Sequence, residues 1–137
     1  RRGRATAGRV EGVVPAMKNP RLFLASCAAL LAASASAAGP EVRPQFEGLL
    51  PALPGQHLRV VTVNYPPGAT SPPHHHQGFV YAYVLSGSIR SQVEGEPARV
   101  YRAGENWIEA PGSQHLVSEN ASAKQPASLL AVLIGDP

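Results

Sequence analysis

The sequence contains 137 residues, of which only 15% are charged, and it includes 13 Gly, 14 Pro and a single Cys. This length is typical of one domain. Because Pro and Gly are frequent and charged residues are scarce, the composition excludes a helical bundle or a coiled coil and favours a turn-rich β structure.

The basic balance of the whole chain comes from its beginning. Residues 1–21 hold six basic side chains against one acidic side chain, whereas from residue 38 onward six basic side chains stand against eight acidic ones, a net charge of −2. The sequence of that later part shows no basic stripe with interleaved aromatic residues. We therefore expect no nucleic-acid partner.

An upstream extension and an export signal are predicted over residues 1–37. The pattern consists of a predicted start at Met17, a positive region at 18–21, an apolar region at 22–33 and small residues at 34–38. This arrangement is typical of a signal peptide, here cleaved after Ala37 or Ala38. The apolar run is shorter than the about 20 residues that a membrane-spanning helix needs, so we expect a periplasmic or secreted protein without a transmembrane segment.

Cys27 offers a second interpretation of this segment. The run Leu24-Ala-Ser-Cys27 resembles a lipobox, in which the cysteine becomes lipidated. Most of the apolar run follows Cys27, which favours the signal peptide over the lipoprotein. After cleavage the mature chain would have no thiol, so neither disulfides nor thiolate metal ligands are expected.

The rest of the chain is predicted to form an irregular arm at 38–56 and a strand-rich β-barrel body at 57–137. Four prolines interrupt the arm, and short segments rich in β-branched and aromatic residues fill the body between Pro, Gly and Asn turns. The predicted strands are 58–65, 79–85, 88–93, 98–102, 107–109, 115–118 and 129–134. Alternation within these segments favours an antiparallel barrel, with Tyr81 and Tyr83 on an outer face that could support a homodimer.

The candidate metal ligands are three histidines. In an extended chain His74 and His76 project to one face of the strand and His75 projects to the other. His115 follows a Pro-Gly turn near the start of a later strand and could complete a three-His centre. Three neutral imidazoles with open positions opposite suit Fe, Ni, Zn, Cu or Co, and also Mn if an oxygen ligand joins them.

Two motifs in the body resemble those of a known family. They are Gly68-x5-His74-x-His76 with Gly87, and Gly104-x6-Pro111-Gly112-x2-His115 with Asn120. Together they resemble the signature motifs of the cupin superfamily, in particular of small single-domain cupins, over residues 59–134. The resemblance implies an all-β jelly roll, the double-stranded β-helix barrel, often dimeric, in which His74, His76 and His115 hold a metal inside the barrel.

The acidic ligand of that family has no counterpart at its usual place, because the motif spacing assigns it to position 80 and this chain has Val80. Either three histidines form the centre alone, or another polar residue replaces the acid. Glu109, on the strand before the third histidine, is the best candidate, and Gln77 is a weaker one. If Glu109 points inward without binding the metal, it is the expected catalytic general base. The alternative is that Glu109 has no function and is simply an exposed glutamate on a strand.

These residues favour a metalloenzyme, with dioxygenase, lyase and isomerase chemistry all open. A divalent transition metal on the three histidines would polarise a small oxygenated substrate or bring it to dioxygen. An apolar wall of Val80, Ala82, Val84 and Trp107 would exclude water. Two other functions stay open: a non-catalytic small-molecule binder or sensor, and a periplasmic metal-binding protein.

Overall fold

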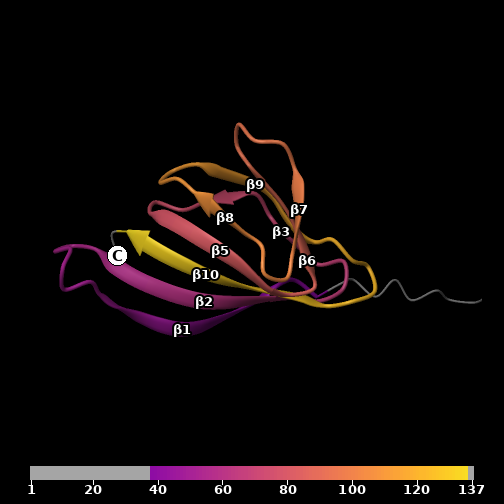
Figure 1. Cartoon of the computed structure of the whole chain (residues 1–137), viewed down its shortest axis with the longest axis horizontal. Coiled ribbons are helices and arrows are strands. Elements are labelled where there is room, and N and C mark those ends of the chain that lie inside the picture. Colours follow the sequence, from indigo (N-terminus) through magenta and orange to yellow (C-terminus); the bar gives the residue numbers. More distant parts are fainter. Residues whose placement is uncertain (1–37, 136–137) are drawn as a thin grey trace, which may run out of the picture. The chain divides into compact units, whose positions relative to one another are not determined.

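A computed structural model describes residues 38–135, which form an all-β domain (Figure 1). The predicted extension, signal peptide and lipobox of residues 1–37 lie outside this part. Within it, no helix is long and apolar enough to cross a membrane. The strands are β1 (Glu41–Leu49), β2 (His57–Tyr65), β3 (Thr70–Ser71), β4 (His74–His75), β5 (Phe79–Ser86), β6 (Ser88–Val93), β7 (Arg99–Arg102), β8 (Asn106–Glu109), β9 (Gln114–Asn120) and β10 (Ala127–Gly135).

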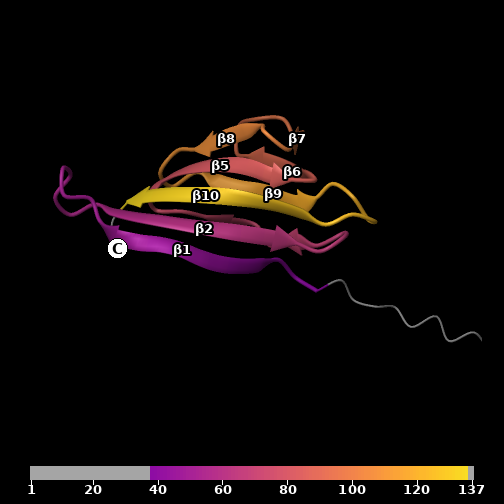
Figure 2. The ribbon, with the colours of Figure 1, turned by 60° about the horizontal axis from the view of Figure 1, so that its bottom comes forward.

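The strands belong to two antiparallel sheets. One sheet has the order β1-β2-β10-β5-β8, which can be followed from bottom to top in Figure 2, and the other has the order β3-β9-β6-β7, with β4 paired to β9. Successive strands such as β5 and β6 lie in different sheets, so the chain crosses repeatedly between the two layers. This is the double-stranded β-helix of a jelly roll, and the predicted fold class is confirmed.

All seven predicted strands are present, and their ends differ from the prediction by at most two residues. The side chains of β5 alternate as expected. Val80, Ala82 and Val84 are buried in the interior, whereas Tyr81 and Tyr83 lie half-buried on the outer face of the sheet. Trp107 joins the same buried core from the neighbouring strand.

The prediction of an irregular arm at 38–56 is wrong for its first half, because β1 pairs along its length with β2. Pro44 misled the prediction, since proline lacks the N–H that a central strand must donate. β1 lies at the edge of its sheet, where only one side of the strand has a partner. The register also shifts between Pro44 and Phe46, and this β-bulge absorbs the irregularity.

Candidate functional site

The three predicted histidine ligands lie together at one end of the barrel. β4 pairs with β9 so that His74 stands directly opposite His115, and their ring centroids are 5.1 Å apart. His76 follows β4, with its ring centroid 5.0 Å from that of His74. His75 is exposed, as the alternation of an extended chain predicts.

Glu109 lies on β8 directly opposite Val80 of β5. Directly paired residues project to the same face of a sheet. The carboxylate therefore occupies the interior position one strand away from the place where the motif spacing expects an acid. Only 3% of Glu109 is exposed, so the alternative of an exposed strand Glu is wrong. Gln77, the weaker candidate, lines a neighbouring hollow instead.

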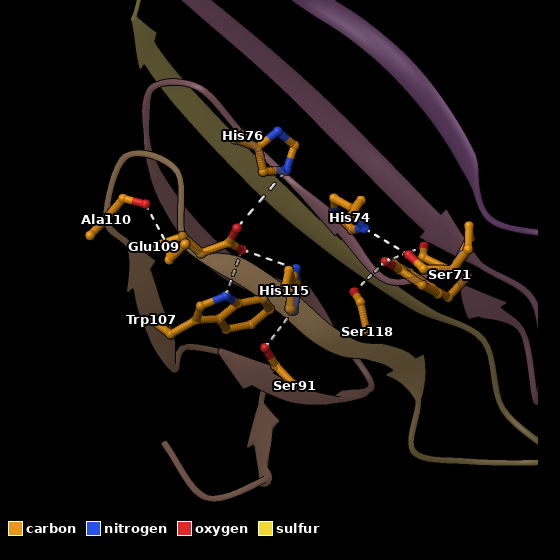
Figure 3. A network of polar contacts seen from close by, with 12 residues as sticks. Ser71, His74, His76, Ser91, Trp107, Glu109, Ala110, His115 and Ser118 are labelled. Carbon is orange, nitrogen blue, oxygen red and sulfur yellow. Dashed lines mark hydrogen bonds and ion pairs between the residues drawn. The ribbon is translucent and has the colours of Figure 1, made fainter. Parts of the chain in front are cut away.

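The Glu109 carboxylate connects the histidines to the core (Figure 3). Its Oε1 accepts a hydrogen bond from Trp107 Nε1 at 3.1 Å and lies 3.1 Å from His115 Nδ1. Its Oε2 lies 3.9 Å from His76 Nε2 and has no hydrogen-bond partner among the described residues. A buried carboxylate oxygen without a partner is costly, and so indicates that a water molecule or a cation belongs beside it.

Hydrogen bonds fix the ring orientation of two of the histidines. His74 Nδ1 donates to the carbonyl oxygen of Pro72 at 2.8 Å, which leaves the lone pair of Nε2 available. His115 is held from both sides, because its Nδ1 faces Glu109 and its Nε2 lies 2.8 Å from Ser91 Oγ. The carboxylate makes Nδ1 the donor of that ring, so Nε2 accepts from the Ser91 hydroxyl.

Burial keeps two of the imidazoles neutral. It lowers the pKa of His76 and of His115 below the usual value of 6.5, and in both rings it outweighs the opposing attraction of the Glu109 carboxylate. The neighbouring His74 lowers both pKa values further. Neutral rings are the form in which histidine binds a metal.

The donor set fits a divalent transition metal by type, since it consists of three imidazoles and one carboxylate. Two ligands at ~2.1 Å from one cation stand about 3.0–3.4 Å apart; the Glu109 carboxylate lies 3.1 Å from His115 Nδ1, within this range, and 3.9 Å from His76 Nε2, outside it. In the conformation described, however, no group of three or more His, Cys, Asp or Glu side chains within residues 38–135 is arranged to hold a metal ion. In this conformation both ring nitrogens of His115 already have partners, Glu109 at Nδ1 and Ser91 at Nε2.

A cavity of about 370 Å³ adjoins the histidines. Its polar side carries His74, His76 and His115, and its apolar side comes mostly from β2 and β10, with one residue of β1 and one between β3 and β4. The apolar lining residues are Val42, Val61, Val63, Pro72, Leu129, Ala131 and Leu133. The predicted wall of Val80, Ala82, Val84 and Trp107 is wrong, because these side chains pack in the core or on its border and none is among the residues that line the cavity.

Three hydroxyl groups and one guanidinium on the cavity lining were not predicted. Tyr65 Oη lies 2.7 Å from Ser118 Oγ and 3.1 Å from Ser71 Oγ, and Arg59 lies on the same strand as Tyr65. The alternation Arg59, Val61, Val63, Tyr65 was visible in the sequence and could have indicated that these residues share one face.

Comparisons with known proteins place this arrangement in a family. Residues 61–133 match the family model described as "Cupin domain". No curated protein sequence gives a significant match.

Three of the solved structures that resemble this chain are the following. The DMSP lyase DddQ from Ruegeria pomeroyi is 25% identical with a TM-score of 0.52, over 58% of this chain and 39% of the lyase. TT1209 from Thermus thermophilus is 25% identical with a TM-score of 0.58, over 72% of this chain and 86% of that protein. An RmlC-like cupin with a double-stranded β-helix fold from Methanocaldococcus jannaschii is 13% identical with a TM-score of 0.56, over 75% of this chain and 84% of that one, and shows the fold alone. The family model covers more than half of the chain, and the described strands form the matching jelly roll: this protein belongs to the cupin family.

Proposed function

We propose that this protein is a metal-dependent cupin enzyme that acts on a small organic substrate. One divalent transition metal would be held by His74, His76 and His115. The single observation that supports this most strongly is the buried and unpartnered Oε2 of Glu109, which faces one of these imidazoles beside a cavity.

Glu109 is better placed as a fourth ligand than as a general base that touches substrate. Its side chain is buried, and the cavity lining includes its neighbours His76 and His115 but not Glu109 itself. A carboxylate added to three imidazoles also offsets part of the charge of a divalent cation in a site of low dielectric constant.

The bound metal would supply a Lewis acid for the substrate or for dioxygen. The side chains of the cavity would do the remaining work. Val61, Val63 and Leu129 would exclude water from the reacting end of the substrate, and the hydroxyls of Tyr65 and Ser118 are close enough to each other to orient an oxygen of the substrate by hydrogen bonding.

The cavity also bears on the two other candidate functions. A protein that only stores metal has no need for an open position beside its ligands, whereas here the imidazoles line a space large enough for a small molecule. A non-catalytic binder would use the same cavity, and turnover separates it from an enzyme. We also place the mature chain in the periplasm or outside the cell, on the signal peptide predicted in residues 17–38.

The first test is the metal content of protein produced from Met17 and recovered after export. Elemental analysis should give about one transition metal per chain, because the donors form one cluster. His76→Ala should lose most of it, and His75→Ala is the matched control, since His75 is adjacent but exposed. Glu109→Ala should weaken metal retention if the carboxylate is a ligand.

Two results would decide against the metal centre, and a third against catalysis. The proposed metal centre would be contradicted if the folded protein contains no metal and takes up none on titration with Fe²⁺, Mn²⁺, Ni²⁺, Zn²⁺, Cu²⁺ or Co²⁺. Equal loss of metal in His75→Ala and His76→Ala would show binding to an exposed histidine tract. Catalysis would be contradicted if the metal-loaded protein consumes no oxygen and turns over no member of a panel of organic acids, thiols and diketones. The remaining functions would then be a small-molecule binder or a metal-binding protein.

A further inference from the structure

We infer that the substrate of this cavity is a small organic anion whose carboxylate group binds the guanidinium of Arg59, while its other end reaches the histidine cluster. This inference rests on the proposed function only in naming the histidine cluster as the reacting end. The binding of the carboxylate depends on Arg59 and on the shape of the cavity.

The charges on the cavity lining favour an anion. Among the described residues that line this space, Arg59 is the one with a permanent charge, and no acidic side chain lines it. A cation held by the histidines would add further positive potential, which a carboxylate would complement.

The strand register places Arg59 and Glu109 in one row of interior side chains, in which Glu47 of β1 stands beyond Arg59. Arg59 pairs with Leu133, Leu133 pairs with Val80, and Val80 pairs with Glu109. These residues lie on four neighbouring strands, so the Cα atoms of Arg59 and Glu109 are about 14 Å apart by the usual strand spacing. The two long side chains shorten this span, and what remains suits a molecule of a few carbon atoms.

The part of the cavity between Arg59 and the histidine cluster is apolar. Leu133 lines the cavity next to Arg59, and Val61 and Ala131 line it one row further along the strands. Methylene groups gain free energy when they leave water for such a surface. A second charged group in the middle of the substrate would instead lose its hydration without gaining a partner. The expected substrate therefore has a short apolar segment behind its carboxylate.

Arg59 is free to exchange its present partner. Its Nη2 lies 3.3 Å from Glu47 Oε1, and both side chains are more than half exposed. Exposed ion pairs contribute little to stability, with a median of about 0–1 kcal/mol. The carboxylate of a ligand could form a bidentate pair with the guanidinium inside the cavity and displace Glu47 from it.

The test compares butyrate with butyramide, two probes of similar shape that differ in charge, by NMR titration of the exported protein. Butyrate should bind more tightly than butyramide. Arg59→Gln should lower the affinity for butyrate about tenfold, as expected for the loss of a charge-assisted hydrogen bond, and leave the affinity for butyramide unchanged. Glu47→Gln should strengthen butyrate binding, because it removes the competing carboxylate.

Arg43→Gln is the matched control. Arg43 forms the same kind of exposed pair, with Glu41 at 2.9 Å, but it pairs with Thr62 on the opposite face of the sheet from Arg59. The inference is overturned if butyrate and butyramide bind equally, or if Arg43→Gln weakens butyrate as much as Arg59→Gln does.

The same titration, run with and without a chelator, separates this inference from the proposed function. Metal content is measured in each sample. A preference for butyrate that depends on Arg59 and survives in metal-free protein would support the inference even if the metal centre fails. Butyrate binding that disappears with the metal and ignores Arg59→Gln would mean that the carboxylate binds the metal itself, and would overturn the inference alone.

Discussion

Ser91 and Trp107 support the candidate site from the core side. Ser91 hydrogen-bonds His115 Nε2, and Trp107 donates to Glu109 Oε1, so each of these two buried polar atoms has a partner on the side of the core. The oxygen without a partner, Glu109 Oε2, is on the side of His76. The carboxylate oxygen that is left without a hydrogen bond therefore lies where a cation would bind.

The Ser91 hydroxyl can be tested by Ser91→Ala. Ser91 is only 2% exposed, and without its hydroxyl His115 Nε2 would be buried without a donor, so we expect the free energy of unfolding to fall by about 1–3 kcal/mol. Urea denaturation measures this. Ser113→Ala is the control, since Ser113 Oγ donates to Ala110 O in an exposed turn; equal losses in the two variants would contradict the role given to Ser91.

At the scale of elements, Gly87 turns the chain from one sheet into the other, between β5 and β6. Its φ is +68°, and a Cβ there would lie 2.6 Å from the carbonyl oxygen of Pro126 and 2.8 Å from Ala127 Cβ. Gly112, in the turn before β9, has a similar φ of +77° but open space around the added carbon. The two positions separate backbone strain from steric crowding.

We therefore expect Gly112→Ala and Gly87→Ala to differ in thermal denaturation. Gly112→Ala should lower the free energy of unfolding by about 1–2 kcal/mol, which is the cost of the left-handed conformation alone. Gly87→Ala should cost clearly more, because the added carbon would meet two backbone atoms and the Cβ attached to one of them, none of which can move without the chain. If the two variants are equally stable, the corner between β5 and β6 is not as tightly packed as the structure indicates.

The predictability of these elements depends on how local their signals are. Seven strands could be predicted because alternating side chains between turn residues are a local pattern, and β1 was missed because Pro44 is compatible with a strand only at the edge of a sheet. The edge position of β1 is set by pairing with β2, which the composition of the arm does not reveal.

The same distinction applies to the site. His74 and His76 could be placed on one face from their spacing, whereas the opposition of Val80 and Glu109 depends on the register of β5 against β8. The prediction of the cavity wall was wrong for a related reason. Both β2 and β5 present apolar side chains to the interior, and only the packing of the two sheets against each other decides which of these side chains border the cavity.

At the scale of the described domain, part of the outer face of the first sheet is apolar, and Phe46 and Ile108 on it are 53% and 58% exposed. The register joins Phe46, Val60, Val132, Tyr81 and Ile108 in one row across its five strands. A neighbouring row consists of Gly48, Leu58, Ile134 and Phe79, and neither row contains a charged side chain. Soluble monomers rarely expose continuous apolar patches of this kind.

A second copy of the chain is the expected cover for this face. Five strands and the two apolar rows span about 24 Å by about 14 Å. This is less than half of the ~800 Å² that each partner buries in a standard interface, so a dimer contact would also cover the neighbouring row of Arg43, Thr62, Leu130, Tyr83 and Asn106. The absence of charge in the two apolar rows suits contact with an identical surface, because an isologous pair brings like residues together. The homodimer remains a prediction, and we propose this face as its interface.

Light scattering coupled to size exclusion should show a dimer, and Ile108→Lys should shift it towards monomer. Ile108 is 58% exposed, so the lysine can be accommodated in the folded chain, but an isologous contact would bury two like charges in an apolar interface. Val100→Lys is the control, since Val100 is an exposed apolar residue on β7 in the other sheet. A protein that is monomeric at high concentration, or a dimer broken by Val100→Lys and kept by Ile108→Lys, would assign the apolar face to another partner.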